Sequence, residues 1–501
     1  MGRLSFLKRA NAQHTVFLPP MSEAEQKYET VIGLEVHARL STKSKLFCSD
    51  ANSYGAAPNE NVGVITLAHP GTLPKANKQA IEYAVMMGLA CNCTINRKNY
   101  FARKHYFYPD LPKGFQTSQH AVPICGSGFV TIKTTAGERN VKLHHIHLEE
   151  DAGKSIHDMD EDYSFIDYNR AGTPLIEIVT EPDMHSAEEA GLFVTELRKL
   201  VRWINVCDGN MEEGSLRCDA NVSLRLKGET KLGTKVEVKN LNSIRNVRKA
   251  IEFEIERMTV LLDRGEKIFQ QTRSFDASTD TTFAIREKEE ANDYRYFPEP
   301  DLPPLDLNDV YVNDIKNKLP ELPQQLYIKY QAEFGLNEYD AAQLTAEKNV
   351  ADYFETVSQY TKNYKAIANW INGPIKQLVN DESILLERIA PNRLAEIIEI
   401  VEKDEVSFSN ASLKLLPAII KNNAEPVTAL AAQLNIIQTK NTDELTEWIK
   451  IVINKMPDKV AEYKKGKKGL MGLFVGEVKK LSKGKADLKS VTQMLEEALK
   501  S

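Results

Sequence analysis

The chain has 501 residues, 42% of them hydrophobic and 27% charged, which is the composition of a globular protein of roughly three domains. Its net charge of −6 excludes a globally basic surface, so any contact with nucleic acid must be local. No run approaches about 18 apolar residues, so no membrane span is expected, and six cysteines in so long a chain fit a reducing compartment rather than a disulfide scaffold.

The N-terminus is basic. Arg3, Lys8 and Arg9 precede the first acidic residue, Glu23. Basic, acid-poor segments are typical of organelle presequences, but a disordered leader or an upstream start codon gives the same pattern. We expect residues 1–27 to be a disordered N-terminal extension and the protein to be cytoplasmic, with an organelle as the alternative.

The first folded region, residues 28–318, has the pattern of short strands separated by turns rich in glycine and proline. Polar and apolar residues alternate in three segments, 31–40, 217–226 and 234–239. Two other segments, 188–204 and 244–262, have the apolar spacing of helices packed on a sheet. We therefore predict an α+β fold whose mixed, largely antiparallel sheet forms a cradle.

Four prolines between residues 298 and 304 end this region, because proline disrupts both strand ladders and helices. The sequence beyond them is almost entirely helical, and its composition shifts near residues 422–426. We expect an all-α helical domain at 319–424, followed by a small all-α tail domain at 425–501.

The strand at residues 31–40 carries Glu35 and His37 on one face, since side chains two apart point the same way. A solvated polar face is the commoner explanation of one such strand. Mixed acidic and basic faces recur, however, with Arg217, Asp219 and Lys239. Such faces suit an anionic substrate with a metal ion, with plain solvated edges as the alternative.

Further carboxylates lie elsewhere in this region. Glu177 stands in an otherwise apolar strand, where a charge destabilises the fold unless it has a partner. Glu149 and Glu150 belong to an acidic turn, for which a solvated surface is the plainer explanation. If these acids converge with Glu35 and His37, a hard divalent ion such as Mg²⁺ is the natural neutraliser.

Familiar nucleotide-binding and hydrolase motifs do not occur in the sequence. Gly153-Lys154-Ser155 ends like a P-loop, but Leu148 occupies the position of its first glycine. No Gly-x-Ser-x-Gly elbow occurs, and no cysteine stands out as a glutaminase nucleophile. If the chain handles ATP, it does so without a P-loop.

Several long motifs, in the same order, resemble the family of B subunits of the tRNA-dependent amidotransferase (GatB). The resemblance covers the chain from about residue 28 to the C-terminus. Its motifs are ETVIGLEVH (29–37), RKHYFYPDLPKG (103–114), HLEEDAGK (147–154), NRAGTPLIEIVTEPD (169–183), MEEGSLRCDAN (211–221), DYRYFPEPD (293–301) and GLFVG (472–476).

The resemblance implies an enzyme that uses ATP and glutamine to amidate Glu or Asp misattached to tRNA. The side-chain carboxylate would be phosphorylated and then attacked by ammonia delivered through a tunnel. Glu150 is favoured over Glu149, although strict alternation puts Glu149 on the side of His147. The residues implied for Mg²⁺ are Glu35, His37, Glu150 and Glu177, and those implied for phosphate or substrate are Lys104, Arg217, Asp219 and Lys239.

The resemblance also implies partners, namely a glutaminase A subunit and a C subunit in a heterotrimer, and misacylated tRNA. Many members of the family bind zinc through Cys-x-Cys and a distant cysteine pair. Here Cys48 is followed by Ser49-Asp50, and the later positions are Val62-Gly63-Val64-Ile65. We therefore predict no zinc.

Nine lysines fall within residues 464–489, opposed only by Glu477 and Asp487. A solubilising surface is the usual explanation. Glycines among these lysines let backbone approach phosphate, and the tail of the family is thought to grip tRNA. Two other functions stay open, a non-catalytic tRNA-binding scaffold and a metal-dependent hydrolase acting on nucleic acid. The sequence does not distinguish Glu-tRNA(Gln) from Asp-tRNA(Asn) as the substrate.

Overall fold

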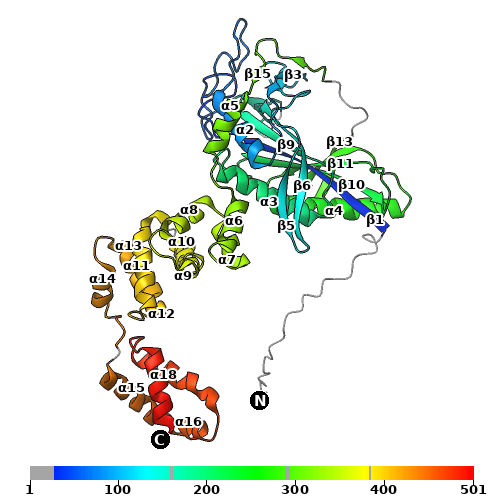
Figure 1. Cartoon of the computed structure of the whole chain (residues 1–501). Helices are drawn as coiled ribbons and strands as arrows, with labels where there is room; N and C mark the ends of the chain where they lie inside the picture. Colours follow the sequence, from blue (N-terminus) through cyan, green and yellow to red (C-terminus); the bar gives the residue numbers. More distant parts are fainter. Residues whose placement is uncertain are drawn as a thin grey trace. The chain divides into compact units, whose positions relative to one another are not determined.

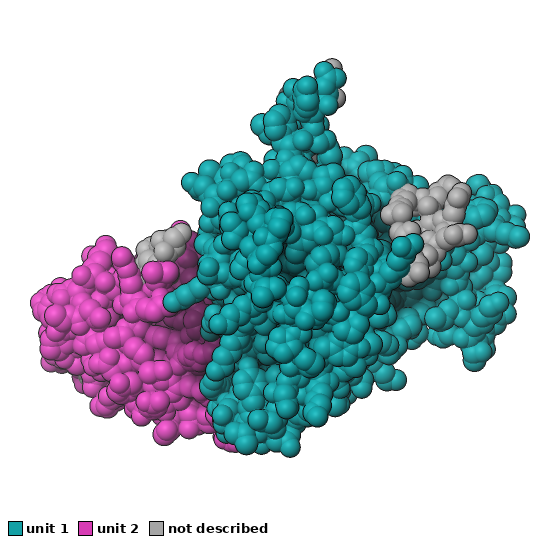
Figure 2. Space-filling view, turned by 90° about the horizontal axis from the view of Figure 1, so that it is seen from above, with its two compact units in different colours: residues 1–320 teal, residues 321–501 magenta. Residues whose placement is uncertain are grey.

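The computed structural model describes residues 27–157, 159–160, 162–287, 294–382, 385–439 and 441–500. The chain forms two compact units, residues 1–320 and 321–501, which Figure 2 colours separately. The prediction of a disordered extension falls on residues 1–26, outside the described residues, and on Lys27.

An eight-stranded sheet forms the framework of the first unit, in the order β13-β12-β11-β10-β1-β9-β6-β5. Neighbouring strands are antiparallel except β11 and β12, which are parallel. The strands are β1 (Tyr28–Arg39), β5 (Gly128–Thr134), β6 (Gly137–Glu150), β9 (Pro174–Thr180), β10 (Leu216–Leu226), β11 (Val236–Leu241), β12 (Gln271–Asp276) and β13 (Thr281–Glu287). The sheet is mixed and largely antiparallel, as predicted.

Two helices, α3 (Ala187–Trp203) and α4 (Ile244–Asp263), lie side by side along one face of this sheet (Figure 1). Each begins at a serine, Ser186 or Ser243, whose side chain accepts a hydrogen bond from a backbone N–H of the first turn. Strand β1 buries the apolar side chains of its alternation, from Ile32 to Ala38, whereas its polar side chains stay half-buried on the opposite face. The polar face of the sheet is therefore free to carry a site.

A small three-stranded sheet, β14-β3-β4, packs against the end of β6. It consists of β3 (Ala102–His105), β4 (Phe115–Ser118) and β14 (Phe297–Pro298). Gln116 of β4 donates a hydrogen bond to the carbonyl oxygen of Glu150, at 2.8 Å. Two motifs far apart in the sequence are thereby joined beside the polar face.

Shorter elements complete the first unit. They are α2 (Lys78–Ala90), the paired strands β2 (Lys98–Asn99) and β15 (Leu305–Asp306), the hairpin of β7 (Lys154–Ile156) and β8 (Phe165–Asp167), and α5 (Asp309–Lys318).

Every named element in the described part of the second unit is a helix. The α-helices are α6 (Pro323–Ala332), α7 (Glu338–Leu344), α8 (Lys348–Val357), α9 (Tyr364–Trp370), α10 (Lys376–Glu382), α11 (Pro391–Glu402), α12 (Phe408–Asn410), α13 (Leu416–Lys421), α14 (Val427–Gln433), α15 (Thr442–Lys455), α16 (Pro457–Lys464), α17 (Met471–Leu481) and α18 (Leu488–Lys500). The predicted α+β cradle followed by a helical region is confirmed. Among the described residues, no helix combines the length and apolar character needed to cross a membrane.

The last four helices of this unit share a hydrophobic core that includes Leu445, Ile449, Phe474, Val491 and Leu495. The structure groups all of residues 321–501 as one compact unit. The predicted division at residue 424 stays a prediction.

Candidate functional site

Three neighbouring strands place a row of ionisable side chains across the polar face of the sheet. In the strand register, His37 of β1 lies opposite Glu177 of β9, and His147 of β6 lies opposite the same Glu177 from the other side. Directly opposed residues on one face of an antiparallel pair are close enough to interact. The register, rather than any local motif, brings these residues together.

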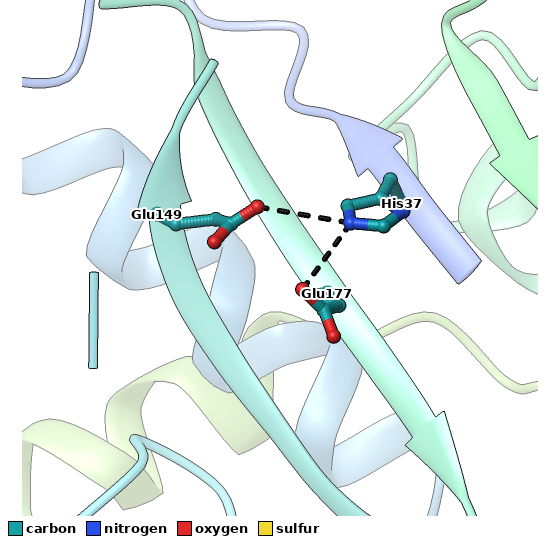
Figure 3. Close-up of side chains that lie close together, drawn as sticks. All are labelled: His37, Glu149 and Glu177. Atoms are coloured by element: carbon teal, nitrogen blue, oxygen red, sulfur yellow. Dashed lines mark ion pairs between the residues drawn. The ribbon is translucent and has the colours of Figure 1, made fainter. Parts of the chain in front are cut away.

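Glu149 joins this row because it lies two residues beyond His147 on the same face of β6. The Nε2 atom of His37 is 3.2 Å from Oε2 of Glu177 and 3.7 Å from Oε1 of Glu149 (Figure 3). The Nε2 atom of His147 is 3.4 Å from Oε2 of Glu149 and 3.6 Å from Oε2 of Glu177. We call His37, Glu149 and Glu177 the imidazole cluster.

The imidazole of His37 and the carboxylates of this cluster each favour the charged form of the other. Burial alone would lower the pKa of His37, but its hydrogen bond to Glu177 and the charges of Glu177 and Glu149 raise that pKa to about 9. Burial alone would raise the pKa of Glu177, yet the hydrogen bond from His37 and the charges of His147, His37 and Lys104 hold it well below its usual range. Without another cation, the imidazoles neutralise the two carboxylates.

The donor atoms of the imidazole cluster are close enough together to bind one divalent metal ion. One ligand atom from each of its three residues lies within 4.8 Å of the others. The ion pairs found for Glu149 and Glu177 among the described residues are with imidazoles, which bind metals when neutral. The carboxylates of Glu149 and Glu177 are the oxygen donors that Mg²⁺ and Mn²⁺ prefer, whereas the imidazole of His37 is a donor more typical of softer divalent ions. The two carboxylates therefore fit the predicted ion.

A second group of carboxylates, the lysine cluster, lies beside the first on the same face. Glu35 of β1, Asp219 of β10 and Glu237 of β11 also bring one ligand atom each within 4.8 Å. Here a lysine is already present, since Nζ of Lys239 is 2.6 Å from Oδ2 of Asp219 and 3.1 Å from Oε1 of Glu237. Asn221 donates a hydrogen bond to Glu35 at 2.9 Å. Burial and the charges of Glu177 and Glu237 raise the pKa of Glu35.

The structure does not bring Glu150 to His37, contrary to the predicted ligand set. Adjacent residues of a strand point to opposite faces, so Glu150 points away from Glu149. Its carboxylate pairs with Lys113 and accepts a hydrogen bond from the backbone N–H of Thr117 at 2.8 Å. Lys113 and Glu150 line a separate cavity of about 190 Å³. The position predicted for Glu150 is held by Glu149, the side chain that alternation placed with His147.

The remaining predicted site residues lie around the two clusters. Lys104 of β3 places its Nζ 5.0 Å from the ring centre of Tyr294, and its charge acts on Glu177. Arg217 lies opposite His37 in the β1–β10 register, and its Nη2 is 3.0 Å from Oδ2 of Asp151. Its Nε atom is buried without a hydrogen-bond partner among the described residues. Asp219 and Lys239 form the ion pair of the lysine cluster.

The positions considered for zinc form a hydrogen-bonded clasp. Asp50 Oδ2 accepts hydrogen bonds from the backbone N–H of Gly63 at 2.7 Å and from Oγ1 of Thr66 at 2.6 Å. The Cys48 thiol lies 3.5 Å from the same Thr66 hydroxyl. Burial alone would raise the pKa of Asp50, but these hydrogen bonds lower it. The carboxylate of Asp50 therefore holds the two ends of this loop together. The absence of zinc stays a prediction.

Sequence reasoning did not single out His147, Lys113 or Glu237 as site residues. His147 and Glu237 could have been found from strand alternation, because they share a face with Glu149 and Lys239 respectively. Lys113 lies in a turn, and its contact with Glu150 depends on how the small sheet packs on β6. No local pattern marks that contact.

Comparison with known proteins gives a consistent picture. The GatB/GatE catalytic domain family matches residues 30–313, and the GatB domain family matches residues 352–499. The chain is 46% identical over 477 residues to the B subunit of the aspartyl/glutamyl-tRNA(Asn/Gln) amidotransferase of Persephonella marina, covering 95% of this chain and 100% of that protein. It is 45% identical over 476 residues to the protein of the same name from Thermodesulfovibrio yellowstonii, covering 95% of this chain and 100% of the relative.

Proposed function

This chain belongs to the family of aspartyl/glutamyl-tRNA(Asn/Gln) amidotransferase B subunits, and from that premise we propose that the polar face of its sheet holds the amidation site. The substrate is Glu or Asp misattached to tRNA, and the product is the corresponding Gln or Asn. The observation that carries this proposal is the imidazole cluster, in which three separate strands bring His37, Glu149 and Glu177 together.

The reaction that we propose has two steps. An oxygen of the side-chain carboxylate attacks the γ-phosphorus of ATP, the bond to the β-phosphate oxygen breaks, and ADP leaves. Ammonia then attacks the carbonyl carbon of the acyl phosphate, phosphate leaves with the electron pair of its C–O bond, and one proton is released. Both steps need charge neutralisation and positioning more than covalent help from the protein.

His37, Glu149 and Glu177 would hold Mg²⁺, with Glu35 next along β1. When bound, the ion neutralises the charge of the phosphate oxygens. Arg217 would face the same phosphates, because it lies opposite His37 and its side chain is 36% exposed. Lys104 would hold the substrate carboxylate, since its positive charge lies near Glu177 on the rim formed by the small sheet.

Asp219 and Lys239 would border the site on the β10 and β11 side. Burial alone would lower the pKa of Lys239, but Asp219 and Glu237 raise it above its usual value, so the ammonium keeps its charge. This ammonium is paired with Asp219 and Glu237, so it would reduce the repulsion between these carboxylates and the phosphates of the substrate.

The proposal includes partners. The sequence offers no glutaminase nucleophile, so a glutaminase A subunit would supply ammonia, and a C subunit would complete a heterotrimer. We place this assembly in the cytoplasm.

The tail would bind the tRNA. Lys464, Lys465, Lys479 and Lys483 are exposed on and around α16 and α17. Gly469, Gly472 and Gly476 have open space where a side chain would stand. Phosphate can therefore approach both lysines and backbone on this surface.

The deciding experiment is co-expression with candidate A and C subunits, followed by an assay with labelled Glu-tRNA and Asp-tRNA. We expect conversion with ATP and glutamine, and also with ATP and ammonium chloride when the glutaminase is inactivated. If the complex is intact and converts neither tRNA, the proposal that it is an amidotransferase is contradicted. A non-catalytic scaffold would instead keep full activity when Glu35 is replaced by alanine.

A further inference from the structure

A chain of three histidines on β6 leads from the protein surface to the imidazole cluster. The Nδ1 atom of His144 lies 2.7 Å from Nδ1 of His145, and Nε2 of His145 lies 2.9 Å from Nδ1 of His147. His144 is exposed, His145 is half-buried and His147 is buried. The chain ends where Nε2 of His147 faces Glu149 and Glu177.

A β-bulge makes this chain possible. The pairing of β6 with β9 shifts between Leu143 and His145, so His144 is an extra residue on β6. Neighbouring strand residues normally point to opposite faces, but a bulge re-aims them. The rings of His144 and His145 thereby meet with their centres 4.9 Å apart, and His145 stacks on His147 at 5.1 Å with an angle of 19°.

One hydrogen bond and two ion-pair contacts orient the ring of His147. Ionised carboxylates carry no proton to donate, so Nε2 of His147 presents its N–H to Glu149 at 3.4 Å and to Glu177 at 3.6 Å. Its other nitrogen, Nδ1, is held by Nε2 of His145. Both nitrogens of His145 are engaged in turn, so its ring cannot rotate without breaking a contact.

We propose that His145 is a positioning residue for the metal site. It holds the imidazole of His147 against Glu149 and Glu177, and so keeps both carboxylates turned toward His37. The inference rests on the proposed function, because it assumes that these carboxylates bind a divalent ion. Partners that orient metal-binding side chains typically change metal affinity by about 10- to 100-fold when removed.

Two substitutions of His145 separate its two hydrogen bonds. In His145→Gln, the amide group takes the place of Nε2 and can still reach His147. In His145→Asn, the shorter amide takes the place of Nδ1 and reaches only His144. The affinity of the purified full-length chain for Mn²⁺ is measured by the electron paramagnetic resonance signal of the free ion, and thermal melting checks that each variant folds.

We expect His145→Asn to weaken Mn²⁺ binding by about tenfold and His145→Gln by less than about threefold. His144→Ala, which removes only the outer ring, should stay within about twofold of the parent chain. Equal affinities for the Asn variant and the parent would overturn the inference, as would an equal loss in the Asn and Gln variants or a tenfold loss in His144→Ala.

His37→Ala distinguishes failure of the inference from failure of the metal site. We expect this variant to lose Mn²⁺ binding. If it does, and His145→Asn binds as tightly as the parent chain, only the role of His145 is refuted. If the parent chain binds no Mn²⁺, the metal site and the role of His145 are both refuted.

Discussion

The imidazole cluster and the lysine cluster lie on the same face of one sheet, but they neutralise their carboxylates differently. Glu149 and Glu177 face His37 and His147, whereas Asp219 and Glu237 share the ammonium of Lys239. An imidazole can give up its proton and become a metal ligand, but an ammonium of raised pKa keeps its charge. We therefore expect the first cluster to exchange the protons of its imidazoles for a metal cation, whereas the ammonium of the second cluster stays in place.

The largest effect is expected at the centre of the imidazole cluster. Glu177→Gln keeps the shape of the side chain but removes the charge that faces both imidazoles, so transamidation should fall by roughly 100-fold or more. Single-turnover assays of the assembled complex with labelled misacylated tRNA measure this effect. Glu181→Gln, four residues further along, is the matched control and should stay near the parent rate. Similar losses in both variants would refute a specific role for Glu177.

Glu149 and Glu150 provide a sharper comparison, because they are adjacent and point to opposite sides of β6. We expect Glu149→Gln to weaken Mn²⁺ binding by about 10- to 100-fold, since it removes one of the carboxylates proposed to hold the ion. Glu150→Gln should leave that affinity unchanged, because its carboxylate is paired with Lys113. Calorimetric titration of both full-length variants gives the two affinities. The reverse result would favour the ligand set implied by family resemblance.

Lys239→Met tests whether the second cluster depends on its built-in cation. This change removes the ammonium but keeps an unbranched side chain, so three carboxylates are left with their mutual repulsion. We expect transamidation to fall by about tenfold and the number of bound Mn²⁺ ions per chain to rise from one to two. Atomic absorption after equilibrium dialysis counts the ions. An unchanged number of bound Mn²⁺ ions together with full activity would contradict the proposal that the lysine cluster depends on the ammonium of Lys239.

The smallest effect on either cluster is expected from the tail. Replacing Lys464, Lys465, Lys479 and Lys483 together by glutamine should make the slope of log affinity for tRNA against log salt less negative by about 3. Mn²⁺ affinity should not change. Fluorescence anisotropy over a series of salt concentrations gives the slope. The control variant replaces Lys348 and Lys403, each of which is ion-paired with an acidic residue four positions away, and it should leave the slope unaltered.

Strand alternation predicted much of the site from the sequence. It placed Glu35 and His37 on one face of β1 and put Glu149 on the side of His147, and both assignments agree with the structure. The ligand set implied by family resemblance named Glu150 instead. The local rule was the better guide here because the direction of a strand side chain depends only on its position within the strand.

Register could not be predicted in the same way. That His37 and His147 meet Glu177 from two sides depends on how β1, β9 and β6 align, and no single segment contains this information. The separation of Glu35 into the lysine cluster also depends on register, since it lies opposite Asp219 rather than Glu177. The histidine chain additionally needs a bulge, which alternation alone does not reveal.

The Asp50 clasp restricts which residue can stand at position 63. A Cβ atom on Gly63 would lie 2.4 Å from Oδ1 of Asp50, so any larger residue at this position, cysteine included, collides with the clasp. A Gly63→Cys change would therefore push the carboxylate of Asp50 away from the backbone N–H of Gly63 and the hydroxyl of Thr66, and so open the loop that these hydrogen bonds close.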